Sequence, residues 1–541
     1  MDGKKWLKNY EENVPYSLTY PHITLQHFLI KTANDHPGFF ATTLNEVDIT
    51  YGELNKKVNK FAHALQKIGV KKGDRVSLLL VNSPAYVIAF FAILKIEAIV
   101  VNLSVAAQGE ELINFLRDAS SKIIVTLDIF AQNIYKVVQE TPVTDIIIHS
   151  LMGLEKMIKV EKGTPEFKIL NDLAANETEN EPETNGSGND IAVLQYTSGS
   201  TGTPKAAALS HANIVASVCQ SEAWVGVQDA GNASVICIIP FFHVFGMSTC
   251  LLISILKGYR MILMPRFDLF DILPLIKTIE NYRPIFLPAV PSLWAALLSY
   301  PDMDRRILNS IKVATSGGAS LPNWVSEKFE ELTGHKLMNA YGLSEASSAT
   351  HFMPYPTGGP EGSIGLPLPD TDAKIVDIEK GERECEIGGI GELIVKGPQI
   401  MAGYWNDPEL TAIKMRDGWL YTEDVAYMDA NGFFFLVDRK DDLIISSGFN
   451  VYPSEIEAVI LKNQKVKESA VIGIPDRVKG QSIIAILVLE KEVKAEKEEF
   501  IEYCRNNLPD YKRPKRIIFR DQIPKNPAGK PLRRVLKKEF E

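Results

Sequence analysis

Cysteine is scarce in this chain, and its scarcity excludes two ways of holding a fold together. Five cysteines occur among 541 residues, at positions 219, 237, 250, 385 and 504. No two of them form a Cys-x-x-Cys pair, and none belongs to a spacing that metal-ligand sets use. A disulfide framework and a thiolate metal centre are therefore excluded. So few cysteines favour a reducing compartment, and we expect a cytoplasmic protein.

Long apolar runs are missing as well. The longest reads YVIAFFAIL at 86–94 and is closed by Lys95 and Glu97. It is too short to cross a bilayer and is typical of a buried helix. The opening residues, MDGKKWLKNYEEN, lack the apolar centre of a signal peptide. We expect no transmembrane segment, while a peripheral membrane contact and a homodimer stay open.

A strong excess of one charge is also absent. The net charge of −9 at pH 7 gives no reason to expect a nucleic-acid partner. The charge is uneven, however, because residues 501–541 hold 12 Lys+Arg against 5 Asp+Glu. A basic tail of this kind is either a solvated face or a contact for an anionic ligand.

The segments that are present alternate between strand and helix patterns. RVSLLL at 75–80 reads as a buried strand, a helix follows from about Pro84, and AIVVNL at 98–103 reads as the next strand. This alternation predicts an α/β fold with a largely parallel sheet. The chain is longer than one hydrophobic core usually supports. We therefore place domains at 1–437 and 443–541, with a hinge at 438–442.

Two local patterns predict structure more closely. Thr50-x-x-Glu53 is a capping box, and apolar residues at helical spacing follow it up to Gly69, so a helix should begin after Thr50. The stretch AANETENEPETNGSGND at 174–190 is acidic and has no large apolar residue. It predicts a solvated connection with no function of its own.

The stretch YTSGSTGTPK at 196–205 is the first candidate site. Its glycines let backbone N–H groups turn toward an anion, its hydroxyls add donors, and Lys205 adds a full charge, as in a phosphate nest. It is not a P-loop, because no Gly-Lys-Ser/Thr occurs. A flexible Ser/Gly loop without a ligand is the alternative. The candidate anion-binding residues are Thr197, Ser198, Gly199, Ser200, Thr201 and Gly202.

Further motifs follow in a fixed order along the chain. They are PFFH (240–243), SGGAS (316–320), NAYGLSE (339–345), YTED (421–424), DRKDDLIISSGFNVYPSEIE (438–457) and PKNPAGKPLRR (524–534). Together with the first stretch they resemble the adenylate-forming superfamily of acyl-CoA synthetases, amino-acid adenylation domains and beetle luciferases. The resemblance runs from about residue 20 to 538. It implies a large N-terminal domain of stacked αβαβα layers with a small β-barrel, and a smaller, mobile α+β C-terminal domain.

The resemblance also implies a reaction. A carboxylic acid attacks the α-phosphate of ATP to form acyl-AMP and diphosphate, and a thiol such as coenzyme A then displaces AMP. Four residues match the family's catalytic positions: Lys205 with its loop on the β- and γ-phosphates, Glu345 on Mg²⁺, His243 beside the acyl pocket, and Lys530 on the α-phosphate.

Other positions match the family's nucleotide and CoA contacts. Those expected along adenine and its flank are Gly317, Gly318, Ala319, Asn339, Ala340, Tyr341, Gly342 and Ser344. Asp424 and Arg439 match the ribose contacts, Asp441 matches the hinge position, and Gly448 matches the passage for the pantetheine arm. Glu423 stands where the family has glycine, which puts the local backbone geometry and the ATP affinity in doubt.

The sequence says less about the acid substrate than about the nucleotide site. The apolar candidates for the pocket wall are Phe242, Val244, Phe245, Met247 and Trp294. None of them provides the charged anchor that an amino-acid substrate requires, and PFFHVFGM resembles bacterial fatty-acid–CoA ligases. Four alternatives stay open: a ligase for an aryl or cyclic acid, an enzyme that loads a separate carrier protein, a luciferase-like oxygenase, and a non-catalytic acyl-nucleotide-binding protein.

Overall fold

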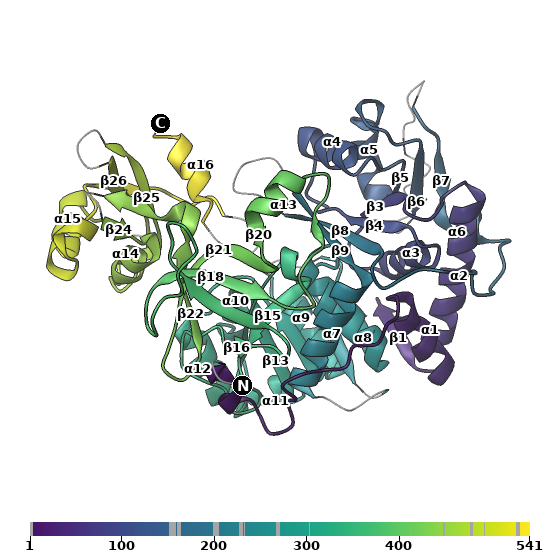
Figure 1. Cartoon of the computed structure of the whole chain (residues 1–541), viewed down its shortest axis with the longest axis horizontal. Helices are drawn as coiled ribbons and strands as arrows, with labels where there is room; N and C mark the ends of the chain where they lie inside the picture. The colour runs from purple at the N-terminus through teal and green to yellow at the C-terminus, as the bar shows by residue number, and fades with distance from the viewer. Residues whose placement is uncertain are drawn as a thin grey trace. The chain divides into compact units, whose positions relative to one another are not determined.

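The structure is a computed structural model that describes residues 4–150, 158, 164–197, 205–226, 231, 233–266, 271–301, 303–446, 449–476, 480–491, 493–525 and 531–540 (Figure 1). The chain divides into two compact units. The larger comprises 7–372 and 396–418, and the smaller comprises 1–6, 373–395 and 419–541. The predicted boundary at 438–442 stays a prediction.

Two large sheets form the centre of the larger unit. The nine-stranded sheet has the order β16-β15-β14-β13-β12-β10-β11-β1-β2, and the eight-stranded sheet has the order β19-β9-β8-β4-β3-β5-β6-β7. Both are mixed sheets with parallel centres, which confirms the predicted α/β class. The strands of the first are β1 Phe40–Leu44, β2 Val47–Thr50, β10 Ser234–Cys237, β11 Arg260–Leu263, β12 Phe286–Ala289, β13 Val313–Gly317, β14 Met338–Leu343, β15 Ser348–Phe352 and β16 Leu366–Pro367. Those of the second are β3 Arg75–Leu79, β4 Ile99–Asn102, β5 Ile123–Leu127, β6 Asp145–His149, β7 Phe167–Ile169, β8 Ile191–Thr197, β9 Lys205–Ser210 and β19 Gly403–Tyr404.

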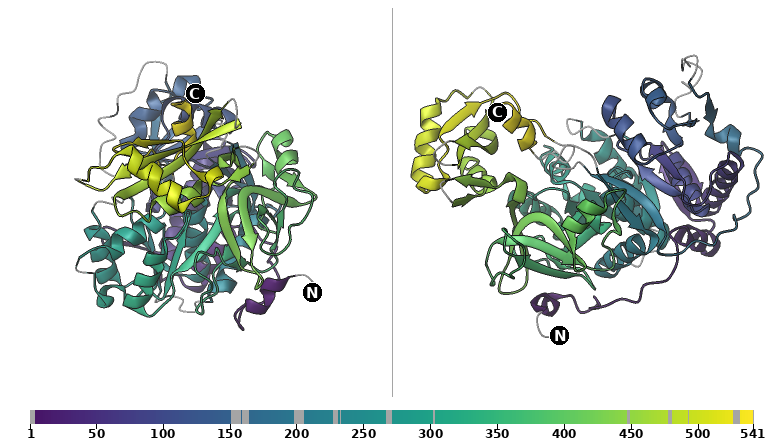
Figure 2. Two further views of the ribbon diagram at one scale, coloured as in Figure 1. Left: turned by 90° about the vertical axis from the view of Figure 1, so that its left-hand side faces the viewer. Right: turned by 45° about the horizontal axis from the view of Figure 1, so that its top comes forward.

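Helices cover the faces of these sheets (Figures 1 and 2). The longer helices are α1 Gln26–Asp35, α2 Tyr51–Lys67, α3 Pro84–Lys95, α4 Gly109–Asp118, α7 His211–Val225, α9 Leu273–Tyr282, α10 Pro291–Leu298 and α12 Asn323–Thr333. The shorter ones are α5 Ala131–Tyr135, α6 Leu170–Ala174, the π-helix η5 Gly246–Leu252, α8 Ile253–Lys257, α11 Arg305–Leu308, α13 Pro408–Lys414 and the 3-10 turns η1 Lys5–Asn9, η2 Asp128–Phe130, η3 Val138–Glu140 and η6 Ser344–Ala346. Helix α7 packs against β8 and β9 of one sheet and β15 of the other, so it lies between the two sheets.

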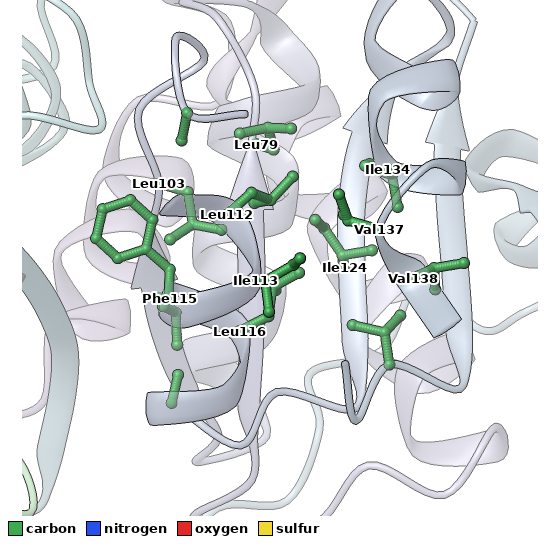
Figure 3. Packing of buried hydrophobic residues seen from close by; sticks show 14 of the residues in the cluster. Leu79, Leu103, Leu112, Ile113, Phe115, Leu116, Ile124, Ile134, Val137 and Val138 are labelled. Atoms are coloured by element: carbon green, nitrogen blue, oxygen red, sulfur yellow. The ribbon is translucent and has the colours of Figure 1, made fainter. Parts of the chain in front are cut away.

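An apolar core attaches the outer helices to the eight-stranded sheet. Figure 3 shows Leu112, Ile113 and Leu116 of α4 beside Ile124 of β5 and Ile134 of α5. All five are at most 3% exposed. This packing fixes the sheet from which strand β8 runs toward the first candidate site.

The local predictions for two helices are confirmed. The Thr50 hydroxyl accepts from the Glu53 N–H and the Glu53 carboxylate accepts from the Thr50 N–H, so the capping box starts α2. The apolar run at 86–94 is the buried helix α3, which Ser83 caps. No helix in the described part of the chain is long and apolar enough to span a membrane.

The smaller unit is built largely around two five-stranded sheets, with orders β17-β18-β21-β20, where β22 pairs with β21, and β24-β23-β26-β25, where β27 pairs with β26. The strands are β17 Asp372–Val376, β18 Gly391–Lys396, β21 Trp419–Met428, β22 Phe434–Arg439, β23 Ile444–Ser446, β24 Phe449–Val451, β25 Val466–Asp476, β26 Gly480–Leu489 and β27 Arg516–Phe519, while the short edge strand β20 Met415–Arg416 falls within the residue range of the larger unit. The helices are η7 Lys440–Asp442, α14 Pro453–Ile460, α15 Lys497–Asn507, η8 Asp510–Lys512 and α16 Arg533–Lys538.

The acidic connection at 174–190 is held more firmly than a solvated loop would be. Lys95 has no exposed side-chain surface, and its Nζ donates to Asn55 and Asn59 at 2.6 Å each and to Glu181. Burial lowers the pKa of Lys95 to about 8, although the pairing with Glu181 opposes that shift. The loop is therefore fastened to α2 and α3 through a buried ammonium.

We predict that Glu181→Gln lowers the free energy of unfolding by about 1–3 kcal/mol, because Lys95 keeps its burial and loses its anion. Urea unfolding followed by circular dichroism measures the change. Glu179→Gln is the matched control, since Glu179 pairs at 3.3 Å with Lys56 where both side chains are at least half exposed. Equal urea midpoints for the two variants would show that the buried Lys95–Glu181 pair stabilises the fold no more than the exposed Lys56–Glu179 pair does.

Candidate active site

The site begins where β13 and β14 end, in the motifs SGGAS and NAYGLSE. Gly317 is the last residue of β13 and pairs with Ala340 of β14. A Cβ atom at Gly317 would lie 3.3 Å from the Ala340 carbonyl oxygen and 3.6 Å from the Phe245 ring. Gly318 follows with φ +81°, a conformation that glycine adopts without strain. The structure thus brings SGGAS, with Ala319 in its turn, against the segment that contains PFFH.

Strand β14 passes even closer to its neighbour. A Cβ atom at Gly342 would lie 1.9 Å from the Ser348 carbonyl oxygen. The register shifts at this point of the β14–β15 pair, next to Tyr341, whose ring packs edge-on to that of His351 at 5.8 Å. The Asn339 side chain donates to the Ser363 carbonyl at 2.8 Å, so its amide braces the strand.

Glu345 follows in η6, which Ser344 begins. Its Oε1 accepts a hydrogen bond from the Tyr404 hydroxyl at 2.8 Å, and its carbonyl accepts from the Met401 N–H at 2.8 Å. Among the described residues no group of three or more His, Cys, Asp or Glu gathers to hold a metal. Glu345 thus offers one oriented carboxylate, which suits Mg²⁺ because that ion usually keeps waters and phosphate oxygens as its other ligands.

The stretch YTSGSTGTPK connects two paired strands. Thr197 ends β8 and pairs in register with Lys205, which begins β9. The Lys205 Nζ lies 2.9 Å from Asp407 Oδ2, and this contact lowers the pKa of Asp407, which also caps α13. Five of the predicted anion-binding residues, Ser198, Gly199, Ser200, Thr201 and Gly202, lie outside the described residues. The structure thus defines the residues on either side of that segment, Thr197 and Lys205.

His243 lies in a tight turn that a glycine makes possible. A Cβ atom at Gly246 would lie 2.2 Å from the Pro240 carbonyl oxygen. The Phe245 N–H donates to His243 Nδ1 at 3.2 Å. The imidazole reaches solvent, yet it is surrounded closely enough that desolvation lowers its pKa. A neutral ring that accepts at Nδ1 carries its proton on Nε2, so His243 presents a neutral N–H donor.

Three residues that the motifs do not mark hold this turn. The Asn82 side chain donates to the Ile239 carbonyl at 2.9 Å and accepts from the Phe241 N–H at 2.8 Å. The Gln195 amide donates to the Phe242 carbonyl at 2.9 Å, and the Tyr86 hydroxyl donates to that of Phe241 at 3.0 Å. The sequence could have marked Gln195 as a candidate, because it is an amide inside the otherwise apolar strand IAVLQY.

A small cavity of about 30 Å³ lies in the larger unit, against the helix that follows this turn. Its exposed surface is mostly apolar, although Ser221, Glu222, Thr249, Lys257 and Thr315 also line it. Thr249, Ile253 and Lys257 line it from one face of the continuous helix η5–α8, opposite Phe286 and Val313 of the nine-stranded sheet. The Thr249 hydroxyl donates to the Phe245 carbonyl at 2.5 Å. Thr249, one of the lining residues, is therefore joined to Phe245, whose ring packs beside Gly317.

None of the apolar candidates for the pocket wall lines this cavity: Phe242, Val244, Phe245, Met247 and Trp294 are all absent from its lining, and Trp294 has a different place. Its side chain is fully buried, its ring packs edge-on to Phe329 of α12 at 5.1 Å, and its Nε1 donates to the Thr315 carbonyl at 3.0 Å. Val244 and Met247 are buried as well, whereas Phe242 and Phe245 are partly exposed. Trp294 thus contributes to the core between α10 and α12.

In the smaller unit Asp424 and Arg439 face each other across β21 and β22. Arg439 Nη1 lies 3.0 Å from Asp424 Oδ1. Glu423, which replaces the family's glycine, has φ +61°. The chain therefore retains the backbone conformation that favours glycine, at a cost of about 1–2 kcal/mol for a residue with a side chain.

The predicted hinge region carries a buried charge network. Arg533 of α16 pairs with Asp442 and Glu457 at 2.8 Å each and approaches Asp438 to 3.6 Å. Glu457 has a raised pKa because it is buried, an effect that Arg533 opposes. Gly448 and Lys530 lie outside the described residues.

The comparisons with known proteins agree with this arrangement. Residues 29–405 match the family described as AMP-binding enzyme, and residues 455–530 match its C-terminal domain. Since the first match covers more than half of the chain, the chain belongs to the AMP-binding enzyme family. The resemblance to adenylate-forming enzymes is confirmed.

Individual relatives cover nearly the whole chain. It is 39% identical to a long-chain-fatty-acid–CoA ligase of Bacillus subtilis (strain 168), over 99% of this chain and 98% of that protein. It is 35% identical to a protein of the same name from Salmonella typhimurium, over 99% and 98% of the two chains. Its structure matches that of ATP-bound MatB from Rhodopseudomonas palustris with a TM-score of 0.86 and 27% identity, over 96% and 99% of the chains.

The close approach at Gly342 generates a prediction. We expect Gly342→Ala to lower the free energy of unfolding by about 1–3 kcal/mol, since the added methyl group would overlap a carbonyl oxygen and force the strands apart. Thermal unfolding measures the effect. Gly38→Ala is the control, because nothing lies within 4 Å of the position that its methyl group would take. Similar midpoints for the two variants would contradict the prediction.

Proposed function

We propose that the chain is an ATP-dependent long-chain fatty-acid–CoA ligase that converts a fatty acid, ATP and coenzyme A to acyl-CoA, AMP and diphosphate. The observation that carries this proposal is the packing of the motif segments of an AMP-binding enzyme, in which Gly317 lies against Phe245, and Thr249, four residues further along the chain, lines a small cavity with a mostly apolar surface. The name of the Bacillus subtilis relative supports the same substrate class.

The first half-reaction must bring two anions together. A carboxylate and a phosphate oxygen 4 Å apart repel by about 4 kcal/mol at an effective dielectric near 20. Lys205 and the segment between β8 and β9 would offset that repulsion at the β- and γ-phosphates, and Lys530 would do so at the α-phosphate. Mg²⁺ bound at Glu345 would add positive charge on the phosphates. Tyr404 would keep the Glu345 carboxylate directed toward that ion.

His243 would position the acid without neutralising it. Its neutral Nε2–H donor can bind one carboxylate oxygen and leave the other free to attack the α-phosphorus. A charged imidazolium would hold the carboxylate as an ion pair and weaken it as a nucleophile. The uncharged state of His243 therefore suits adenylate formation.

The second half-reaction would use the smaller unit differently. We propose that residues 438–442 act as the hinge, with Asp441 as the pivot, and that Gly448 lets the pantetheine arm pass. Asp424 and Arg439 would hold the ribose hydroxyls throughout. All five cysteines are free, which supports a cytoplasmic enzyme.

The assignment of Lys530 to the first half-reaction alone predicts the effect of Lys530→Ala. We expect it to abolish diphosphate release from fatty acid and ATP, while supplied acyl-AMP still reacts with coenzyme A at close to the wild-type rate. Lys525→Ala is the control, since Lys525 is a nearby lysine that pairs with Glu468 at 2.9 Å. Equal losses in both half-reactions would refute the assignment.

His243 gives a prediction with a pH dependence. Removal of a hydrogen bond to a charged group costs about 1.5–3 kcal/mol, so His243→Ala should lower kcat/KM for diphosphate release by roughly tenfold to a hundredfold. Desolvation holds the pKa of His243 below its ordinary value of 6.5, so the imidazole stays neutral as the pH falls through 6.5. The ratio of wild-type to variant activity should therefore stay constant through pH 6.5 and decline only below it. A decline centred at or above 6.5 would contradict the assignment; the exposed His22→Ala is the control.

A further inference from the structure

A buried amide connects the two large sheets beside the candidate active site. Gln195 lies in β8 of the eight-stranded sheet and is 3% exposed. Its Nε2 donates to the Phe242 carbonyl at 2.9 Å, in the turn that follows β10 of the nine-stranded sheet. Phe242 directly precedes His243 in the chain. Gln195 therefore joins β8 to the backbone that carries the His243 imidazole.

A second amide fixes the orientation of the first. Asn102, the last residue of β4, is 2% exposed and pairs in register with Gln195. Its Nδ2 donates to Gln195 Oε1 at 3.2 Å. Because the oxygen of the Gln195 amide accepts from Asn102, its NH₂ group is directed at the Phe242 carbonyl. An amide bonded at both ends holds that carbonyl at a fixed distance from β8.

Strand β8 leads directly into the first candidate site. Two residues after Gln195, Thr197 ends the strand and pairs in register with Lys205 of β9. In the proposed reaction Lys205 binds the β- and γ-phosphates, and His243 binds the acid. The two reactants are therefore held by segments of different sheets. Their reacting atoms must come within about 3–3.5 Å of each other, and a misplacement of about 1 Å can cost a hundredfold in rate.

We infer that Gln195 is a positioning residue, which sets the spacing between the acid at His243 and the triphosphate at Lys205. Its side chain bonds to a backbone carbonyl and to another amide, so it contributes to the rate of adenylate formation and not to the binding of either substrate. The inference rests on the proposed function and on the place of His243 in it.

The test separates kcat from KM in diphosphate release from fatty acid and ATP. Gln195→Met keeps an unbranched side chain of similar length and removes both hydrogen bonds. Its kcat should fall roughly tenfold to a hundredfold, while KM for ATP and KM for the fatty acid keep their wild-type values. Supplied acyl-AMP should react with coenzyme A at the wild-type rate, because acid and phosphate are already joined in it.

Gln220→Met is the matched control. Gln220 is fully buried in α7, and its Nε2 donates to the Pro369 carbonyl at 2.6 Å, between β16 and β17. This variant also loses a buried amide, but it leaves the bond between β8 and the turn before His243 intact. It should keep the wild-type kcat and KM values. Thermal unfolding of both variants establishes a temperature at which each is folded.

A double-mutant cycle tests whether Gln195 acts through His243. Once His243→Ala has removed the imidazole, Gln195→Met should have little further effect on kcat/KM. Losses that multiply in the double variant would show that Gln195 acts independently of His243, and would overturn the inference.

The remaining results are equally decisive. A raised KM with an unchanged kcat would assign Gln195 to substrate binding and overturn the inference. Equal losses in both half-reactions, or equal losses in the Gln195 and Gln220 variants, would show a structural contact and overturn it too. If Gln195→Met behaves as the wild type, the inference fails while the ligase activity stands. If the wild type releases diphosphate with no fatty acid, the proposed function fails and the inference fails with it.

Discussion

Close approach of backbone to backbone is the constraint on which the active site depends. Gly342 lies against the Ser348 carbonyl, and Gly246 lies against that of Pro240, at distances that leave no space for a methyl group. Gly317 lets the Phe245 ring reach the end of β13. The geometry is therefore set by main-chain atoms, which move less than side chains and hold the motif segments rigidly in place.

The larger unit supplies groups of different polarity. Glu345 and Lys205 carry charge at the ends of strands, and His243 presents a neutral donor in the turn beside Phe245. The small cavity lined by Thr249 has a mostly apolar surface. The proposed fatty-acid substrate likewise combines a charged carboxylate with an apolar chain.

Sequence patterns predict the elements better than the contacts between them. The capping box at Thr50 and the buried helix at 86–94 depend on neighbours in sequence, so they are predictable. The Tyr404–Glu345 and Asp407–Lys205 contacts join residues 59 and 202 positions apart. No local pattern marks such partners, because tertiary packing alone brings them together.

Two departures from the predictions have the same cause. The acidic composition of 174–190 predicts solvation, but the acids face lysines on α2 and α3, and that complementarity exists only after folding. The motif around Trp294 suggests a place in the pocket wall, yet its ring packs between helices.

The network around Arg533 links α16 to the predicted hinge region at 438–442. Its guanidinium faces Asp438 before Asp441 and both Asp442 and Glu457 after it. A rotation of the backbone at Asp441 would separate Arg533 from Asp438, while Asp442 and Glu457 would stay paired with it. Arg533 would therefore stay paired with two carboxylates during such a rotation and would not prevent it. Because the network is largely shielded from water, added salt would alter the energy of such a rotation very little.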